Sequence, residues 1–293
     1  MNKKAKGGII AAIILLVLLA LGFGVKSWLR SSSPRDIVKP ISGPNIHVEE
    51  LSYFRGLEKI AGKVYKPQDS LGRKPVVICC SGIGTPGAAW DEVCRTLAKK
   101  GYVAYTFDFR GGYPGSPSSG KTVDMTLSSE KEDLTLVLQR ILKEDFTDPK
   151  NVFLIGHSQG GLVAATVGSG FRKEVAGMIL LAPAFNIPDL VTNQFPSRRD
   201  IPDSAMFVNM YVGKKYITEA KSMDTYRWLR RYKKKVLILQ GKDDTLVPPE
   251  YAELAAEEFP ESELILLDGV AHRFDGTFKN KYILKYLEEQ ITQ

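Results

Sequence analysis

The chain has 293 residues, of which 44% are hydrophobic and 25% charged, as in an ordinary globular protein. This length allows one large α/β domain with a substantial core, or two small domains. The net charge of +7 is moderate, and the spacing of the three cysteines (Cys79, Cys80 and Cys94) argues against a metal site and against a disulfide framework.

The first 25 residues predict a membrane anchor. Residues 1–6 form a basic tail with three lysines, and residues 7–25 contain no charged side chain. As a helix, these 19 residues would span about 28 Å, close to the thickness of a hydrocarbon core. The lysines predict a cytoplasmic tail and a folded domain on the extracytoplasmic side of the cell membrane, in a single-pass protein. The alternative is a signal peptide, whose cleavage would leave a secreted protein.

The next segments lead into the folded domain. Residues 26–44 are rich in serine and proline, which predicts a linker. From residue 45 to residue 66, apolar and polar side chains alternate, and this pattern predicts two antiparallel strands at the edge of a sheet.

A regular alternation of strands and helices then predicts the fold class. Apolar strands are expected at residues 75–81, 102–109, 150–155, 175–182, 235–240 and 263–267. Helices are expected at residues 88–100, 128–143, 158–169, 249–258 and 276–290. Such alternation is typical of a mostly parallel sheet with helices on both faces.

Residues 185–232 interrupt this pattern within the domain formed by residues 45–293. They contain many aromatic side chains, and residues 186–235 hold eleven Lys or Arg against five Asp or Glu. A loop of this length without structure would be unusual, so we expect an inserted, partly helical cap. Its basic surface is either a solvated face or a surface attracted to anionic lipid.

The segment Gly156-His157-Ser158-Gln159-Gly160 has the pattern of a nucleophile elbow. It lies between an apolar strand and a helix of small residues, which is the context that the motif requires. Ser158 must occupy a tight, strained turn, and side chains at positions 156 and 160 would collide there. The N-terminus of the following helix directs free N–H groups and a positive dipole end toward the site.

A serine nucleophile needs a base and a group that orients the base. Of the three histidines, His47 lies in the edge strands and His157 is expected to point away from the nucleophile. His272 lies in a polar loop after the last strand, where a parallel sheet presents its carboxyl edge, and is the predicted base. In the pattern G-x-x-D-x-x-V-P, Asp244 is the predicted acid, and its neighbour Asp243 is interpreted as a turn residue.

An acyl-transfer site also needs hydrogen-bond donors for an oxyanion. The backbone N–H of Gln159, directly after the nucleophile, is one predicted donor. The second is expected in the loop after the first parallel strand, at the N–H of Ile83, with Gly84 as the alternative.

Residues 45–293 resemble the α/β-hydrolase superfamily, and within it the serine-aminopeptidase-like and cinnamoyl (feruloyl) esterase-like branch. The resemblance rests on four segments: 108–111 (Asp-Phe-Arg-Gly), 156–161 (Gly-His-Ser-Gln-Gly-Gly), 180–184 (Leu-Leu-Ala-Pro-Ala) and 241–248 (Gly-Lys-Asp-Asp-Thr-Leu-Val-Pro). The chain order Ser158, Asp244, His272 is also that of α/β-hydrolases.

The resemblance implies an α/β-hydrolase fold with a cap and a serine hydrolase that cleaves a carboxylic ester through an acyl-enzyme. It implies a small-molecule ester or acyl substrate, no metal and no cofactor. A thioesterase, an acyltransferase or a peptidase would use the same triad, and a non-catalytic binding module is the alternative of another class. Nucleic acid is not an expected partner of a domain exported by its own anchor.

Overall fold

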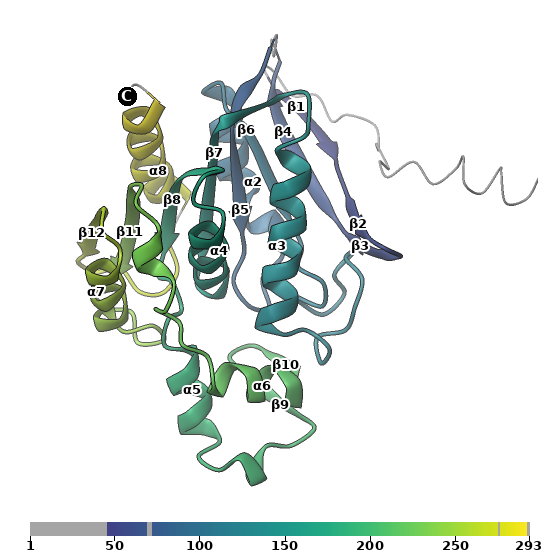
Figure 1. Cartoon of the computed structure of the whole chain (residues 1–293), viewed down its shortest axis with the longest axis vertical. Coiled ribbons are helices and arrows are strands. Elements are labelled where there is room, and N and C mark those ends of the chain that lie inside the picture. Colours follow the sequence, from purple (N-terminus) through teal and green to yellow (C-terminus); the bar gives the residue numbers. More distant parts are fainter. Residues whose placement is uncertain (1–45, 69–71, 275, 292–293) are drawn as a thin grey trace, which may run out of the picture. The chain divides into compact units, whose positions relative to one another are not determined.

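The computed structural model describes residues 46–68, 72–274 and 276–291, and Figure 1 shows their arrangement. The predicted basic tail, anchor and linker, residues 1–44, lie outside the described residues. Among the helices that are described, none has both the length and the apolar character needed to cross a bilayer.

Eight strands form one sheet, in the order β1-β4-β6-β5-β7-β8-β11-β12. The strands are β1 (Ile46–Glu50), β4 (Gly62–Pro67), β5 (Lys74–Cys80), β6 (Val103–Phe107), β7 (Thr147–His157), β8 (Val175–Leu181), β11 (Val236–Gly241) and β12 (Ser262–Leu267). β1 pairs antiparallel with β4, and β4 antiparallel with β6. The strands β6, β5, β7, β8, β11 and β12 pair in parallel. The mostly parallel sheet confirms the predicted fold class.

Helices cover both faces of the sheet (Figure 1). They are α2 (Asp91–Lys99), preceded by the 3-10 turn η1 (Gly87–Trp90), α3 (Leu127–Ile141), α4 (Gln159–Gly170), α7 (Pro249–Glu258) and α8 (Gly276–Ile291). α3, α4 and α7 pack in one core cluster and α2 and α8 in the other. Neighbouring residues of a strand point to opposite faces, so Cys80 lies in the first cluster and Cys79 in the second, where its Sγ is 3.9 Å from the Sγ of Cys94.

The amino-terminal part of the domain contains more strands than the two that its alternation predicts. Between β1 and β4, the chain forms the separate hairpin β2 (Tyr53–Arg55) and β3 (Glu58–Ile60). The turn between them is possible because Gly56 adopts a φ of 62°, which side chains disfavour. The prediction of two strands is therefore corrected to four.

The segment 185–232 is inserted between β8 and β11, and its elements α5, α6, β9 and β10 lie beyond one end of the strands of the sheet (Figure 1). It contains α5 (Ile187–Gln194), η2 (Arg198–Asp200), β9 (Ser204–Phe207), β10 (Met210–Gly213), α6 (Lys214–Lys221) and η3 (Leu229–Arg231). We call this segment the cap. Its antiparallel β9–β10 hairpin is not among the sequence expectations.

Candidate active site

Ser158 lies at the turn between β7 and α4, with φ 55° and ψ −126°. A non-glycine residue rarely adopts this backbone conformation, and such strain persists only where the surroundings hold it. A Cβ on Gly156 would collide with the carbonyl oxygen of Gly160, and a Cβ on Gly160 would collide with that of Ser81. A Cβ on Gly82 would lie 2.9 Å from the Cβ of Ser158. The glycines therefore allow three backbone segments to meet around the serine.

The structure brings Ser158, His272 and Asp244 together at the carboxyl ends of β7, β12 and β11. Nε2 of His272 is 3.0 Å from Oγ of Ser158, and Nδ1 of His272 is 2.8 Å from Oδ2 of Asp244. An ionised carboxylate only accepts hydrogen bonds, so Nδ1 carries the proton and Nε2 is free to accept the serine proton. This is the arrangement that general-base activation of a hydroxyl requires.

Asp244 is held by several groups besides His272. Its Oδ1 accepts the N–H groups of Leu246 (3.0 Å) and Val247 (2.9 Å), and its Oδ2 accepts Nε2 of Gln240 (3.1 Å). Burial acts to raise the pKa of Asp244, but the hydrogen bonds from His272, Val247 and Gln240 outweigh it and lower the pKa. The carboxylate therefore stays ionised and oriented.

The neighbouring Asp243 is exposed, and its backbone N–H donates to the carbonyl oxygen of Val270. The carboxylate partner of the His272 imidazole is Asp244. The two adjacent acids thus occupy different environments, in agreement with the interpretation of Asp243 as a turn residue.

His157 contacts the loop of His272, a contact that sequence reasoning does not find. Its Nε2 donates to the carbonyl oxygen of His272 over 2.8 Å, and the two rings lie 4.9 Å apart. Burial lowers the pKa of His157 to about 4, so the ring is neutral near pH 7. The expectation that His157 simply points away from the nucleophile is incomplete, because its side chain braces the histidine that faces Ser158.

The two candidate segments for oxyanion donors lie on either side of Ser158. Gln159 begins α4, so its N–H has no partner within the helix. The N–H of Gly84 donates to the carbonyl oxygen of Gly112 over 3.0 Å and is therefore occupied. For the N–H of Ile83, the described residues offer no backbone acceptor. The geometry favours Ile83 over Gly84 as the second donor.

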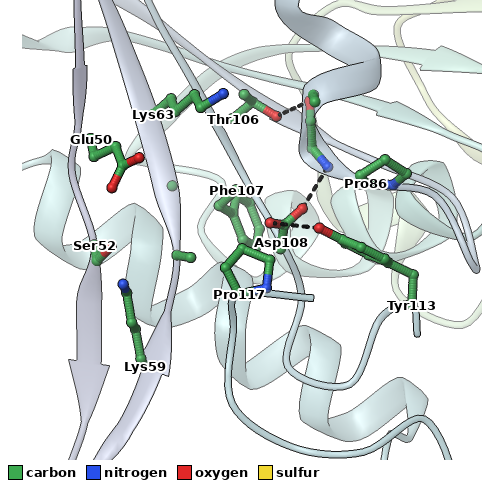
Figure 2. Close-up of a pocket in the computed structure, with 14 residues that line it drawn as sticks. Glu50, Ser52, Lys59, Lys63, Pro86, Thr106, Phe107, Asp108, Tyr113 and Pro117 are labelled. Carbon is green, nitrogen blue, oxygen red and sulfur yellow. Dashed lines mark hydrogen bonds between the residues drawn. The ribbon is translucent and has the colours of Figure 1, made fainter. Parts of the chain in front are cut away.

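A cavity of about 290 Å³ is lined in part by Pro86 and Gly87, at the end of the loop that follows β5 (Figure 2). Oδ1 of Asp108 accepts the N–H of Gly87 over 2.6 Å, and the Tyr113 hydroxyl lies 3.3 Å from Oδ2 of Asp108. Burial raises the pKa of Asp108. Asp108 thus holds the end of the loop that passes Ser158.

Metal ligation has no candidate site in the described part of the chain. Across those residues, no three His, Cys, Asp or Glu side chains are grouped as metal ligands would be.

The sheet order, the inserted cap and the elbow together define an α/β hydrolase. The chain belongs to the serine aminopeptidase family S33, because the model of that family matches residues 72–228, more than half of the chain.

Two individual relatives are similar to parts of the chain. The chain is 32% identical over 119 residues to a putative esterase/lipase 2 of Mycoplasma genitalium, a match that covers 41% of this chain and 40% of the relative. It is 24% identical over 174 residues to the acylamino-acid-releasing enzyme of Mus musculus, covering 55% of this chain and 22% of that enzyme. The chain thus spans less than half the length of these relatives.

Among solved structures, the chain is similar to Est1E from Butyrivibrio proteoclasticus with ferulic acid bound. The TM-score is 0.76 at 23% identity, and the match covers 83% of this chain and 100% of Est1E. This likeness shows a common fold.

Proposed function

We propose that the protein is a serine hydrolase that cleaves a carboxylic ester, with Ser158 as nucleophile, His272 as base and Asp244 as the acid that orients it. The observation that carries this proposal is the continuous hydrogen-bonded chain from Oγ of Ser158 through the imidazole of His272 to the buried carboxylate of Asp244. The similarity to a putative esterase/lipase supports an ester as the substrate.

In this mechanism, His272 takes the proton of Ser158 as Oγ attacks the ester carbonyl. The backbone N–H groups of Gln159 and Ile83 hold the oxyanion of the tetrahedral intermediate. Protonated His272 then gives its proton to the leaving alcohol, and an acyl-enzyme remains on Ser158. His272 next deprotonates a water molecule, whose oxygen attacks the carbonyl carbon of the acyl-enzyme. Protonated His272 returns that proton to Oγ of Ser158 as the bond between Oγ and the acyl group breaks and the acid leaves. These protein groups are sufficient for each step.

Other acyl acceptors and leaving groups fit the same residues. The similarity to an acylamino-acid-releasing enzyme favours a peptidase as the second candidate, beside a thioesterase or an acyltransferase. A binding module without catalysis is the candidate of another class.

The decisive assay compares the purified full chain with its Ser158→Ala variant. p-Nitrophenyl esters from acetyl to long acyl chains, and a feruloyl ester, should be hydrolysed by the wild type and not by Ser158→Ala. If no ester is hydrolysed but a fluorophosphonate labels Ser158, the protein is a more specialised acyl-transfer enzyme. If Ser158 is not labelled either, the binding module is favoured.

We propose further that residues 7–25 anchor the protein in the cell membrane, with the hydrolase domain on the extracytoplasmic side. The uncharged run of residues 7–25 and the lysines before it support this. The full-length protein should stay in the membrane fraction after an alkaline wash, and protease added outside spheroplasts should digest its domain. Release of a shortened chain into the medium would instead indicate a cleaved signal peptide.

A further inference from the structure

The side chain of Gln159 is held at both ends by residues of different elements. The hydroxyl of Tyr216, on α6 of the cap, donates to Oε1 of Gln159 over 2.6 Å. Nε2 of Gln159 donates to Oε2 of Glu130, on α3, over 2.8 Å. Gln159 and Tyr216 are fully buried, and Glu130 is 1% exposed. The amide is therefore fixed between the cap and the body of the domain, without competition from solvent.

Gln159 is also the residue whose backbone N–H is the first oxyanion donor of the proposed mechanism. It occupies the first position of α4, where a residue lacks the constraint of an intrahelical bond from its own N–H. Fixing its side chain at two points limits the rotation of its backbone. An oxyanion donor must keep its direction to be effective, since the benefit depends on donors being oriented before the reaction.

The cap also contacts the segment that carries the second donor. Asn209 lies at the tip of the β9–β10 hairpin, and its carboxamide is so close to Gly84 that a Cβ there would lie 2.6 Å from Nδ2 of Asn209. Gly84 directly follows Ile83. At the same tip, Val208 has a φ of 55°. This conformation is strained for a β-branched residue and indicates that the tip is held in place.

The two contacts belong to one packed unit of the cap. The ring of Phe207, at the end of β9, lies 5.4 Å from the ring of Tyr216 on α6. A shift of the hairpin would therefore disturb the hydroxyl that holds Gln159.

We propose that the seated cap sets the geometry of the oxyanion hole, with Tyr216 and Glu130 as positioning residues that act through the side chain of Gln159, and with Asn209 supporting the loop of Ile83. This rests on the proposed function, because it assigns the oxyanion donors. The cap then acts on catalysis at Ser158 itself. Lifting it lowers the rate of the chemical step as well as changing access to Ser158.

The test compares Tyr216→Phe with Tyr232→Phe in the full chain. Both changes remove one buried hydroxyl, but the hydroxyl of Tyr232 donates to the carbonyl oxygen of Val175 at the start of β8, away from Ser158. Loss of a direct oxyanion donor costs about 10² to 10³ in kcat. For the indirect loss in Tyr216→Phe we expect kcat for ester hydrolysis to fall about tenfold with little change in KM. Tyr232→Phe should keep kcat within about twofold of the wild type.

A pair of substitutions at Glu130 gives a second test of the same contact. Glu130→Gln keeps an oxygen that can accept from Gln159 and should retain kcat. Glu130→Leu removes the acceptor and should lower kcat as Tyr216→Phe does. An unchanged kcat in Tyr216→Phe, or a rise in KM alone, would overturn the proposal, since a residue that only lines the pocket would give that result.

Hydrogen exchange measures the same contact without any substrate. In Tyr216→Phe, amides of residues 159–162 and of the hairpin 204–213 should exchange faster than in the wild type and in Tyr232→Phe. If the wild-type protein hydrolyses no ester, the proposed function fails. Hydrogen exchange then still tests whether the cap holds the elbow in place. Faster exchange in both segments supports a cap that holds the elbow, and unchanged exchange refutes it.

Discussion

Asp243 and Asp244 show how strongly the environment of a single residue determines what it does. The two carboxylates are adjacent in the chain, yet Asp244 is 3% exposed and bonded to Nδ1 of His272, whereas Asp243 is exposed. The carboxylate of Asp244 also accepts two backbone N–H groups, which fix its orientation. The hydrogen bond between Asp244 and His272 therefore depends on the turn after β11.

Replacing these acids in turn should separate their roles. Asn at position 244 can donate to Nδ1 of His272 and thereby favours the tautomer in which Nε2 carries the proton and cannot accept it from Ser158. If the proposed function holds, we expect Asp244→Asn to lower kcat for p-nitrophenyl acetate by about 10⁴, the cost of a wrong tautomer in a known Ser-His-Asp triad. Asp243→Asn is the matched control and should stay within about twofold of the wild type. Equal losses in the two variants would contradict the assignment.

The sequence predicts the contacts of these residues only in part. Motif and chain order single out Ser158, Asp244 and His272 as the candidates, because each follows a predicted strand of a parallel sheet. They do not reveal the contacts of His157 with the His272 loop or of Gln240 with Asp244. His157 ends β7, whereas the loop of His272 follows β12, so their contact depends on how these two strands are arranged in the sheet. The contact of Gln240 with Asp244 depends on how the turn after β11 folds back onto that strand. Neither follows from the spacing of residues in the sequence.

At the scale of elements, the close approach of α4 to β5 positions Ser158. Gly160 faces the backbone carbonyl groups of Cys80 and Ser81, so the helix begins as close to β5 as main-chain atoms allow. At the other end of α4, a Cβ added to Gly170 would meet no atom within 4 Å. Packing therefore requires glycine at position 160 but not at position 170.

Alanine at each of these positions should have opposite effects on stability. In Gly160→Ala, the new methyl group would overlap backbone atoms of β5, and we expect a loss of about 3 kcal/mol in the free energy of unfolding, together with a loss of ester hydrolysis. Gly170→Ala should be neutral or stabilise by up to about 1 kcal/mol, because alanine restricts the unfolded chain and favours the helix. Urea denaturation of both variants measures this. If Gly160→Ala kept the wild-type free energy of unfolding, α4 would be able to move away from β5, and this interpretation would be wrong.

The sequence predicts helix α7 but not the β9–β10 hairpin of the cap. The bounds of α7 follow from its sequence because Pro249 can start a helix and the apolar spacing continues to Glu258. The β9–β10 hairpin turns at Val208 and Asn209, without the Asn-Gly or Asp-Gly pair that marks a two-residue turn. Packing of Phe207 against Tyr216 and of Asn209 against Gly84 holds this turn, and such contacts are invisible to local patterns.

For the molecule as a whole, two buried titratable groups near Ser158 give stability a dependence on pH. The pKa of Glu130 is raised from 4.5 to about 8, mainly by burial, against the opposing hydrogen bond from Gln159. Burial lowers the pKa of His157 from 6.5 to about 4. His157 therefore reduces stability as the pH falls below 6.5, and Glu130 reduces it as the pH rises from 4.5 to 8.

Of these two groups, only Glu130 should change the free energy of unfolding above pH 6.5. The unfolded chain has already lost this proton, whereas the folded chain keeps it until about pH 8, so raising the pH favours unfolding. Each unit of pH in this window is worth about 1.4 kcal/mol, and we expect the free energy of unfolding to fall by about 2 kcal/mol between about pH 6.5 and pH 8. Urea denaturation at the two pH values measures the difference. Glu130→Gln has no proton to lose and keeps an acceptor for Gln159, so its free energy of unfolding should change little over the same range. A parallel decline in wild type and Glu130→Gln would assign the pH dependence to other groups.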